Sequence, residues 1–291
     1  MRIPEKHLQE VRDRGFTTVE GFIAGDELRQ AREALWLHYP RPEEYFANPA
    51  AYPAFGRSQF SGIQLFPYKS WSLNRLAFHP DLVEAAERLI GTDDLDLYKV
   101  ELWAKYAGAI DYEQAHHYDY GNHSLVVPRR DRRDLQITTF LLLSDVTAED
   151  GPTKLVPREF TADSEFVPRE FAKGTFVEEE IAVTGPAGTL LIYATDVVHR
   201  GSNFRQPGRS RFALLADYQR KGVSWAGKMA WPNRADDPNW PATMARASVR
   251  ERDLFGFPAP GDAYWDEQTV RDVGLRYPEM DMTPYHRARR L

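Results

Sequence analysis

The sequence predicts a mainly β protein with flanking helices, built as a sandwich or a double-sheet jelly roll. Two observations support this class. The clearest helical patterns lie before residue 95, whereas residues 95–218 contain many short apolar runs. Turn signals such as Gly151-Pro152 and Gly185-Pro186-Ala187-Gly188 separate those runs. This spacing favours antiparallel strands over βαβ units, and we expect the helices to flank the sheets.

Apolar spacing and capping residues define the helices, and β-branched and aromatic runs define the strands. Pro80 and Gly91, for example, suit the first turn and the C-terminal cap of a helix. Helices are expected at residues 5–13, 26–39, 80–90 and 242–254. Strands are expected at residues 16–22, 95–106, 135–143, 154–156, 181–184, 189–193 and 211–218. Residues 40–75 show no clean period and predict an irregular segment.

We expect a single domain over residues 1–291. Residues 1–94 form a mostly helical N-terminal support in this interpretation, and residues 95–218 form the jelly-roll core that carries the functional site. Residues 219–291 are rich in Trp and Pro and are interpreted as a lid or a dimer element. Four tryptophans in that last region need a surface to bury them, which argues against a floppy tail.

Composition excludes several classes of function. The chain has no cysteine, so thiolate zinc sites, iron–sulfur clusters, disulfides and cysteine nucleophiles are excluded. Any metal must therefore be held by His, Asp and Glu. The net charge of −6 argues against nucleic-acid binding. No apolar signal segment or membrane-spanning run is found, so we expect a cytoplasmic protein without a membrane partner, with a homodimer left open.

The segment around His117 carries the most informative pattern. His117 and Asp119 are two residues apart, and on an extended strand such side chains point to the same side. Two His and one carboxylate on one face of a metal form the triad of non-haem Fe(II) oxygenases. The third candidate ligand is His199, which follows an apolar strand and precedes a Gly-Ser-Asn turn. His199 alone is more often a buried structural histidine, and it gains weight from the other two.

Other polar residues near His117 have competing interpretations. His116 and His123 also carry imidazoles, but only His117 has the His-x-Asp spacing, and His116 should face the other side. His123 is expected at the mouth of the site, where we predict substrate contacts for Tyr118, Tyr120 and His123.

Two arginines follow the second histidine. Arg209 and Arg211 lie at the start of a strand, and a guanidinium group can hold a carboxylate in a bidentate fork. A 2-oxo acid that chelates a metal through its keto-acid end needs such an anchor for its far carboxylate. The two arginines share a strand face, so parity does not choose between them. We prefer Arg211, because the apolar strand continues directly from it.

These motifs, in this order, resemble the phytanoyl-CoA dioxygenase family of Fe(II)/2-oxoglutarate oxygenases over roughly residues 15 to 218. The matching segments are 15–23, His117 with Asp119, 149–157, 199–203 and Arg211. The resemblance implies a double-stranded β-helix (a cupin-like jelly roll) with helices packed on one sheet. It also implies Fe(II) held by His117, Asp119 and His199, with O2 and 2-oxoglutarate as co-substrates and Arg211 on the distal carboxylate.

The resemblance further implies a dioxygenase that oxidises, by hydroxylation in the first instance, a C–H bond of a small organic metabolite. Lys105, Thr138 and Phe140 lie on strands that could line the cofactor pocket, although ordinary strand roles are the simpler interpretation. Two alternatives stay open: a cupin-like metal enzyme that does not use 2-oxoglutarate, and a non-catalytic jelly roll that binds a small molecule. The ligand set does not distinguish hydroxylation from desaturation or cyclisation.

The chain departs from the family pattern after the Val-Pro turn. The family's Pro-Gly-Ser-His is replaced by Pro157-Arg158-Glu159-Phe160, and Val156–Phe160 recurs as Val167–Phe171. This repeat is too short for a solenoid and predicts a locally duplicated surface loop. Asp119 is present where related halogenases have a small residue, which argues against halogenation.

Overall fold

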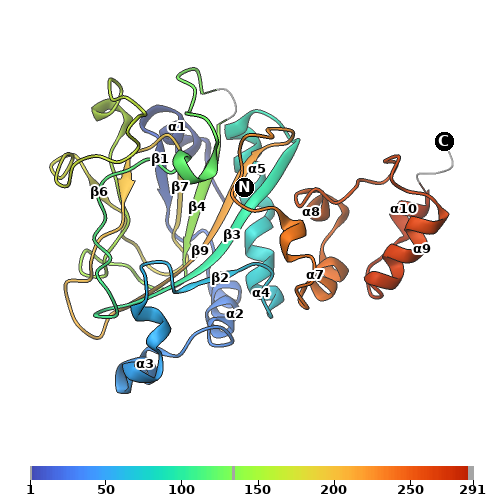
Figure 1. Ribbon diagram of the computed structural model, residues 1–291, viewed down its shortest axis with the longest axis horizontal. Coiled ribbons are helices and arrows are strands. Elements are labelled where there is room, and N and C mark those ends of the chain that lie inside the picture. Colours follow the sequence, from blue (N-terminus) through green and yellow to red (C-terminus); the bar gives the residue numbers. More distant parts are fainter. Residues whose placement is uncertain (1, 133–134, 288–291) are drawn as a thin grey trace.

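A computed structural model describes residues 2–132 and 135–287 of the chain. Two antiparallel sheets form its centre, and helices cover the outer face of the larger one (Figure 1). The larger sheet has the order β1 (Phe16–Val19), β7 (Leu190–Ala194), β4 (Ile137–Leu142), β9 (Ser210–Arg220), β3 (Leu95–Tyr106) and β2 (Ile63–Leu65). The smaller sheet has the order β6 (Ile181–Ala182), β5 (Lys154–Leu155) and β8 (His199–Arg200). The mainly β class with flanking helices is confirmed.

The helices of the N-terminal part begin within one residue of the predicted positions, because their caps are local signals, but the second one ends at Leu35 and not at residue 39. Gly15, with a φ of 99°, ends the first helix, and Pro80 opens the helix that Gly91 ends with a φ of 81°. The helices are α1 (Glu5–Arg14), α2 (Gly25–Leu35), α3 (Pro42–Ala47), α4 (Trp71–Asn74), α5 (Pro80–Ile90), α6 (Tyr120–His123), α7 (Trp240–Arg246), α8 (Val249–Asp253), α9 (Glu267–Arg276) and α10 (Thr283–Arg287). In the described parts of the chain, none combines the length and apolar character needed to cross a bilayer.

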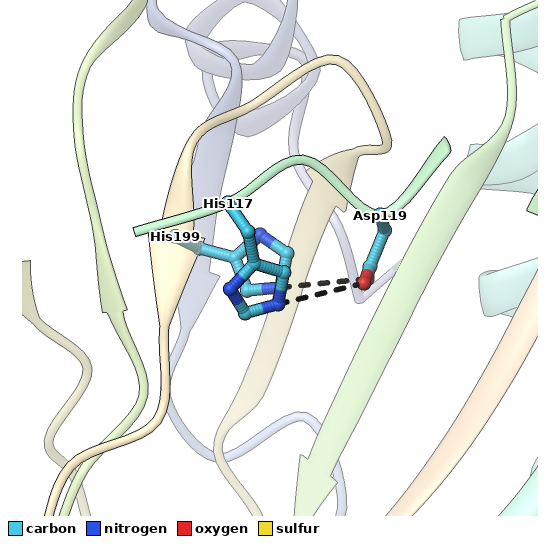
Figure 2. A group of neighbouring side chains, drawn as sticks. All are labelled: His117, Asp119 and His199. Carbon is cyan, nitrogen blue, oxygen red and sulfur yellow. Dashed lines mark ion pairs between the residues drawn. The ribbon is translucent and has the colours of Figure 1, made fainter. Parts of the chain in front are cut away.

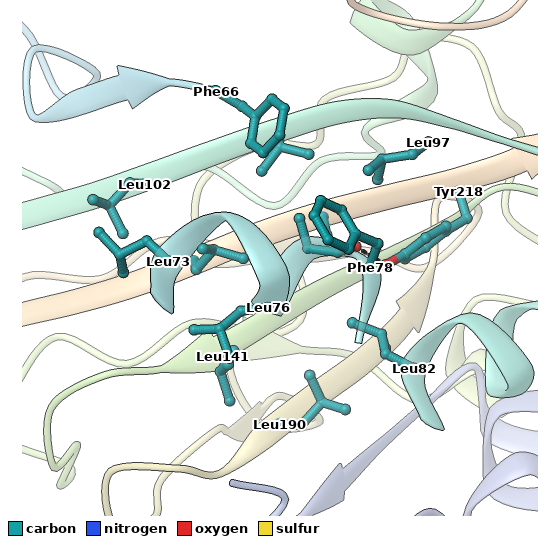
Figure 3. Packing of buried hydrophobic residues seen from close by; sticks show 14 of the residues in the cluster. Phe66, Leu73, Leu76, Phe78, Leu82, Leu97, Leu102, Leu141, Leu190 and Tyr218 are labelled. Atoms are coloured by element: carbon teal, nitrogen blue, oxygen red, sulfur yellow. Dashed lines mark hydrogen bonds between the residues drawn. The ribbon is translucent and has the colours of Figure 1, made fainter. Parts of the chain in front are cut away.

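The two faces of the long strand β3 differ in character. A register shift between Leu97 and Lys99 sets the alternation of the residues that follow. From there, the apolar positions face the helices, where Leu102 packs with Leu73 and Leu76 (Figure 3). The opposite face carries alternating polar and aromatic side chains, at Lys99, Glu101, Trp103 and Lys105. The large sheet therefore has one face for the hydrophobic core and one polar face that is free to build a site.

Phe66, directly after β2, joins the C-terminal helices to this core. Its side chain is fully buried, and its ring lies 5.2 Å from Phe255 and 5.6 Å from both Trp231 and Trp240. Replacing Phe66 by alanine is expected to lower the free energy of unfolding by about 3–5 kcal/mol, because a large aromatic cavity remains. Urea unfolding measures this loss. Phe160→Ala, at a half-exposed ring, is the matched control and should change stability by less than about 1 kcal/mol. Equal losses in the two variants would contradict this packing.

Several expected elements differ from the structure. Residues 40–75 are not wholly irregular: they contain α3, β2 and α4, which are too short to show a period. The helix expected at 242–254 is split at Ser248, whose side chain caps α8 in a capping box with Glu251. Helices α9 and α10 and strand β8 were not predicted.

The region after residue 218 packs on the body through aromatic side chains. Trp231, Trp240 and Trp265 are buried, whereas Trp225 remains 44% exposed, so the expectation that all four are covered is wrong for Trp225. Helices α9 and α10 lie at the far end of the molecule from the small sheet (Figure 1). The last four residues of the predicted lid or dimer element lie outside the described residues. A role of this region in dimerisation stays a prediction.

Candidate metal centre

The segment that carries His117 is held on both sides by backbone hydrogen bonds. On one side, His117 and His199 exchange N–H···O bonds of 2.9 and 3.0 Å. On the other side, the Tyr118 N–H donates to Arg169 O and the Phe171 N–H donates to His116 O, each at 2.9 Å. His117 therefore extends the small sheet beyond its edge strand β8, directly beside His199. A rigid backbone of this kind fixes where both imidazoles point.

The structure brings His117, Asp119 and His199 together (Figure 2). Their candidate ligand atoms all lie within 4.8 Å of one another. Nε2 of His199 is 3.4 Å from Oδ2 of Asp119, and Nε2 of His117 is 3.9 Å from Oδ1. These spacings leave room for an ion at the centre of the three groups, since ligand atoms about 2 Å from one metal lie about 3 Å apart.

Hydrogen bonds set both imidazoles in the tautomer that a metal needs. Nδ1 of His117 lies 2.9 Å from Ala115 O, and Nδ1 of His199 lies 3.1 Å from Val197 O. A carbonyl oxygen only accepts, so both Nδ1 atoms carry the proton and both Nε2 lone pairs face Asp119. Burial also lowers the pKa of His199 to about 4, which keeps its ring neutral at pH 7. The donor set therefore fits a divalent metal with nitrogen and oxygen ligands.

Asp119 reaches the site from a turn, not from a strand as expected. Its backbone is helical (φ −78°, ψ −18°), and it caps the short helix α6. Burial acts to raise its pKa, but His199, His123 and Lys99 outweigh burial and hold that pKa well below the usual range. Lys99 is the member of this set that is cationic at neutral pH, so we attribute the ionised state of Asp119 mainly to Lys99.

Tyr193 on β7 orients the carboxylate. Its hydroxyl donates to Oδ2 of Asp119 at 2.9 Å. Replacing Tyr193 by phenylalanine is expected to weaken metal binding about tenfold, because partners that orient a ligand typically contribute 10- to 100-fold in affinity. Competition with a chromogenic chelator measures the change. Tyr106→Phe, which removes a hydroxyl bonded to Pro40 O, is the matched control and should bind metal like the wild type. An unchanged affinity in Tyr193→Phe would remove Tyr193 from the site.

A pair of buried cations lies at one end of the same pocket. Lys105 and Arg211 are directly opposite each other in the β3–β9 ladder, and both are at least 92% buried. The Arg211 guanidinium donates to Gly151 O, while the Lys105 ammonium lies over the Tyr112 ring, 4.6 Å from its centroid. Within residues 2–132 and 135–287, neither cation has a carboxylate at ion-pair distance. Burial lowers the pKa of Lys105 well below its usual value and that of Arg211 to about 10.

Uncompensated buried charge is unfavourable, so this end of the pocket is suited to a bound carboxylate group. Arg209 does not share this environment. It forms two hydrogen bonds, of 2.5 and 2.8 Å, with the carboxylate of Asp150 and is partly exposed. The geometry therefore favours Arg211 over Arg209 as the carboxylate anchor, a choice that strand parity left open.

The cavity between the sheets measures about 370 Å³ and joins the metal ligands to the cation pair. Phe140 and Trp103 line it. Thr138, which we expected to line the cofactor pocket, lies between Asp217 and Tyr193 in the sheet and is completely buried below the cavity surface. It therefore supports neighbouring residues and does not face a ligand.

Of the three expected substrate contacts, His123 alone lines the cavity. Its Nδ1 is 2.9 Å from the Tyr98 hydroxyl, and burial lowers its pKa to about 3. Tyr118 lies on the opposite side of its strand from His117 and packs with Phe171, while Tyr120 also lies outside this cavity. The prediction of substrate contacts for Tyr118 and Tyr120 is therefore corrected.

Sequence reasoning missed a buried charge cluster next to Asp119. Nζ of Lys99 is 2.9 Å from Asp217 and 3.8 Å from Glu101, and all three side chains are almost fully buried. A signal was present, because charged residues at alternate positions of an otherwise apolar strand mark a face that turns toward a polar cavity. The partner Asp217 could not be found this way, since the register between β3 and β9 is not encoded locally.

Comparisons with known proteins agree with this architecture. The sequence profile of the phytanoyl-CoA dioxygenase family (PhyH) matches residues 11–213. No curated protein matches the sequence. Similar solved structures include the epimerase SnoN in complex with Fe3+, α-ketoglutarate and nogalamycin RO (TM-score 0.54, 19% identity, 77% of this chain and 86% of that chain). The α-ketoglutarate-dependent carbocyclase SnoK from nogalamycin biosynthesis gives a TM-score of 0.55 at 16% identity over 80% and 90% of the two chains.

HygX from Streptomyces hygroscopicus, with nickel and 2-oxoglutarate bound, gives a TM-score of 0.54 at 14% identity over 76% of this chain and 88% of that chain. At these identities the likenesses show the fold. They confirm the predicted jelly-roll core of the double-stranded β-helix type, with helices on one sheet.

Proposed function

The chain belongs to the phytanoyl-CoA dioxygenase family, and from this premise we propose that it is an Fe(II)- and 2-oxoglutarate-dependent dioxygenase that oxidises a C–H bond of a small organic molecule. One observation carries the proposal. A single cavity holds a His, Asp and His set with neither Nε2 atom in a hydrogen bond, and it ends in two buried cations that have no acidic partner among the described residues. The first feature suits Fe(II), and the second suits the distal carboxylate of 2-oxoglutarate.

The protein's own residues have separate tasks in this proposal. His117, Asp119 and His199 would hold the metal, and Tyr193 fixes the orientation of the carboxylate. Arg211 would bind the distal carboxylate through its planar fork, which places the keto-acid end toward the metal. When bound, Fe(II), 2-oxoglutarate and O2 together supply the oxidising chemistry, and hydroxylation is the outcome we propose.

Lys105 supplies the second positive charge at the co-substrate end. Its ammonium group lies over the rings of Tyr112 and Trp103, and the neighbouring Phe140 completes an apolar wall. Such walls exclude water and strengthen the attraction between the cations and a bound dicarboxylate.

The direct test is 2-oxoglutarate turnover by the purified protein with Fe(II) under air. Succinate should form slowly without an added substrate, and its formation should stop when Fe(II) is removed by a chelator. A cupin-like enzyme that does not use 2-oxoglutarate, or a non-catalytic binding protein, would form no succinate. Once a substrate is found by screening, mass spectrometry of its product checks hydroxylation, because hydroxylation adds one oxygen atom to the substrate.

A further inference from the structure

A second group of cations lines the cavity beyond the metal ligands. Lys99 lies six positions from Lys105 along β3, about 20 Å away at the rise of an extended strand. Lys228, from the loop after β9, and Arg169, from the duplicated loop, line the cavity as well. Cationic side chains therefore line two ends of the cavity, although the chain as a whole carries a net charge of −6.

The cations away from the co-substrate end differ in their partners. Lys99 pairs with Asp217 at 2.9 Å, and Lys228 pairs with Glu101 at 3.2 Å. The exposed guanidinium of Arg169 has no carboxylate at ion-pair distance among the described residues, its neighbour Glu170 included. Its hydrogen bond, from Nη1 to Tyr118 O, is long at 3.4 Å. Arg169 therefore lines the cavity and has guanidinium N–H groups that can donate hydrogen bonds to a ligand.

The first copy of the repeated Val-Pro-Arg-Glu-Phe sequence shows the opposite situation. Arg158 is buried and donates to both carboxylate oxygens of Asp196, at 2.6 and 3.2 Å. It also donates to the carbonyl oxygens of Val11 and Arg12. The same five residues thus place one arginine where its donors are satisfied by the protein, and the other at the cavity. Arg158 therefore has a structural role, whereas Arg169 is available to bind a ligand.

A glycine leaves room for the side chain of Arg169 to pack against α6. A Cβ atom added to Gly121 in α6 would lie 2.1 Å from Cδ and 2.7 Å from Nε of Arg169. The arginine therefore lies flat against the helix backbone at a position where any other residue would displace it. Gly121 shows no positive φ, so the backbone itself does not require glycine here. The absence of a side chain at this position therefore permits the observed placement of Arg169.

We propose that Arg169 is a specificity residue that binds a carboxylate or phosphate group of the substrate, so that the substrate class is small organic anions. This inference rests on the proposed dioxygenase function. A guanidinium fork matches either oxyanion in a bidentate geometry. Arg169 belongs to the segment that pairs with the His117 strand, so an anion bound there is held at a fixed position relative to the metal ligands. The remaining part of the substrate then lies in the cavity next to the metal.

The test measures the binding of matched probes to protein that is loaded with Zn(II) and saturated with 2-oxoglutarate. Ligand-observed NMR detects the binding. The probes are benzoate and phenyl phosphate, with benzamide and phenol as neutral counterparts. At least one anion should bind the wild type, and Arg169→Ala should weaken its binding about tenfold, the usual effect of losing a charge-assisted hydrogen bond. The preferred anion separates carboxylate from phosphate recognition. Arg205→Ala, at an exposed arginine outside the cavity, is the control and should bind like the wild type.

Gly121→Ala is the second variant, because it displaces the guanidinium without removing its charge. It should weaken anion binding in the wild-type background and have little further effect in Arg169→Ala. Both variants should keep the affinity of the Fe(II)-loaded protein for 2-oxoglutarate, so failure of the dioxygenase proposal would be visible separately. The inference is overturned if neither anion binds the wild type, if the neutral counterparts bind equally well, or if both variants bind anions unchanged.

Discussion

Replacing His199 by alanine is expected to lower the affinity for Fe(II) by more than about 100-fold and to reduce succinate formation to background. The imidazole supplies one of three ligand atoms, and its tautomer is fixed by the hydrogen bond to Val197 O. Loss of a ligand exceeds the 10- to 100-fold effect of losing a partner that merely orients one. Anaerobic equilibrium dialysis measures the affinity, and circular dichroism confirms that the variant is folded.

The neighbouring histidine provides the control for this prediction. His116 faces away from the cavity, and its Nε2 lies 3.0 Å from Glu180. His116→Gln keeps a polar group near Glu180 and should bind Fe(II) like the wild type. If His116→Gln loses the metal and His199→Ala keeps it, the ligand assignment is wrong.

Replacing Arg211 by alanine is expected to weaken 2-oxoglutarate binding by about 100-fold while metal binding stays intact. Removing one partner of a buried charge pair costs about 2–5 kcal/mol, and each 1.4 kcal/mol is a factor of ten in affinity. The KM for 2-oxoglutarate in the succinate assay, together with Fe(II) affinity, separates this effect from loss of the metal. The same variant would retain its activity if the protein were a metal enzyme that does not use 2-oxoglutarate.

Arg209→Ala is the matched control, since Arg209 lies two residues away and is held outside the cavity by Asp150. It should keep a KM for 2-oxoglutarate within about threefold of the wild type, because Arg209 does not line the cavity. A larger effect in Arg209→Ala than in Arg211→Ala would reverse the assignment of the carboxylate anchor.

The candidate metal ligands could be selected from sequence because their chemistry depends on residue type and short spacing. Strand parity also placed His116 on the side away from His117, as the structure shows. The same parity places Tyr118 on the side away from His117, so it argues against the substrate contact that was predicted for Tyr118. The predicted strand geometry failed at Asp119, since the chain turns into α6 there. A two-residue spacing thus indicated residues that the structure brings together, although the local backbone was different.

Contacts between distant strands could not be predicted in this way. Thr138 has the residue type and the strand position expected of a pocket residue, but it is completely buried between Asp217 and Tyr193 in the sheet and does not line the cavity. Arg158 and Arg169 stand in identical five-residue sequences, yet one is buried in an ion pair and the other lines the cavity. Tertiary packing sets these environments, and no local signal distinguishes them.

Anaerobic titration of the Fe(II)-loaded protein with 2-oxoglutarate tests the central claim most directly. Chelation of the metal by the keto acid produces a weak visible charge-transfer band. We predict this band in the wild type, its loss in His199→Ala, and a shift to higher 2-oxoglutarate concentrations in Arg211→Ala. A folded, iron-loaded wild type that shows no band at saturating 2-oxoglutarate would contradict the claim that this cavity is a 2-oxoglutarate-dependent iron site.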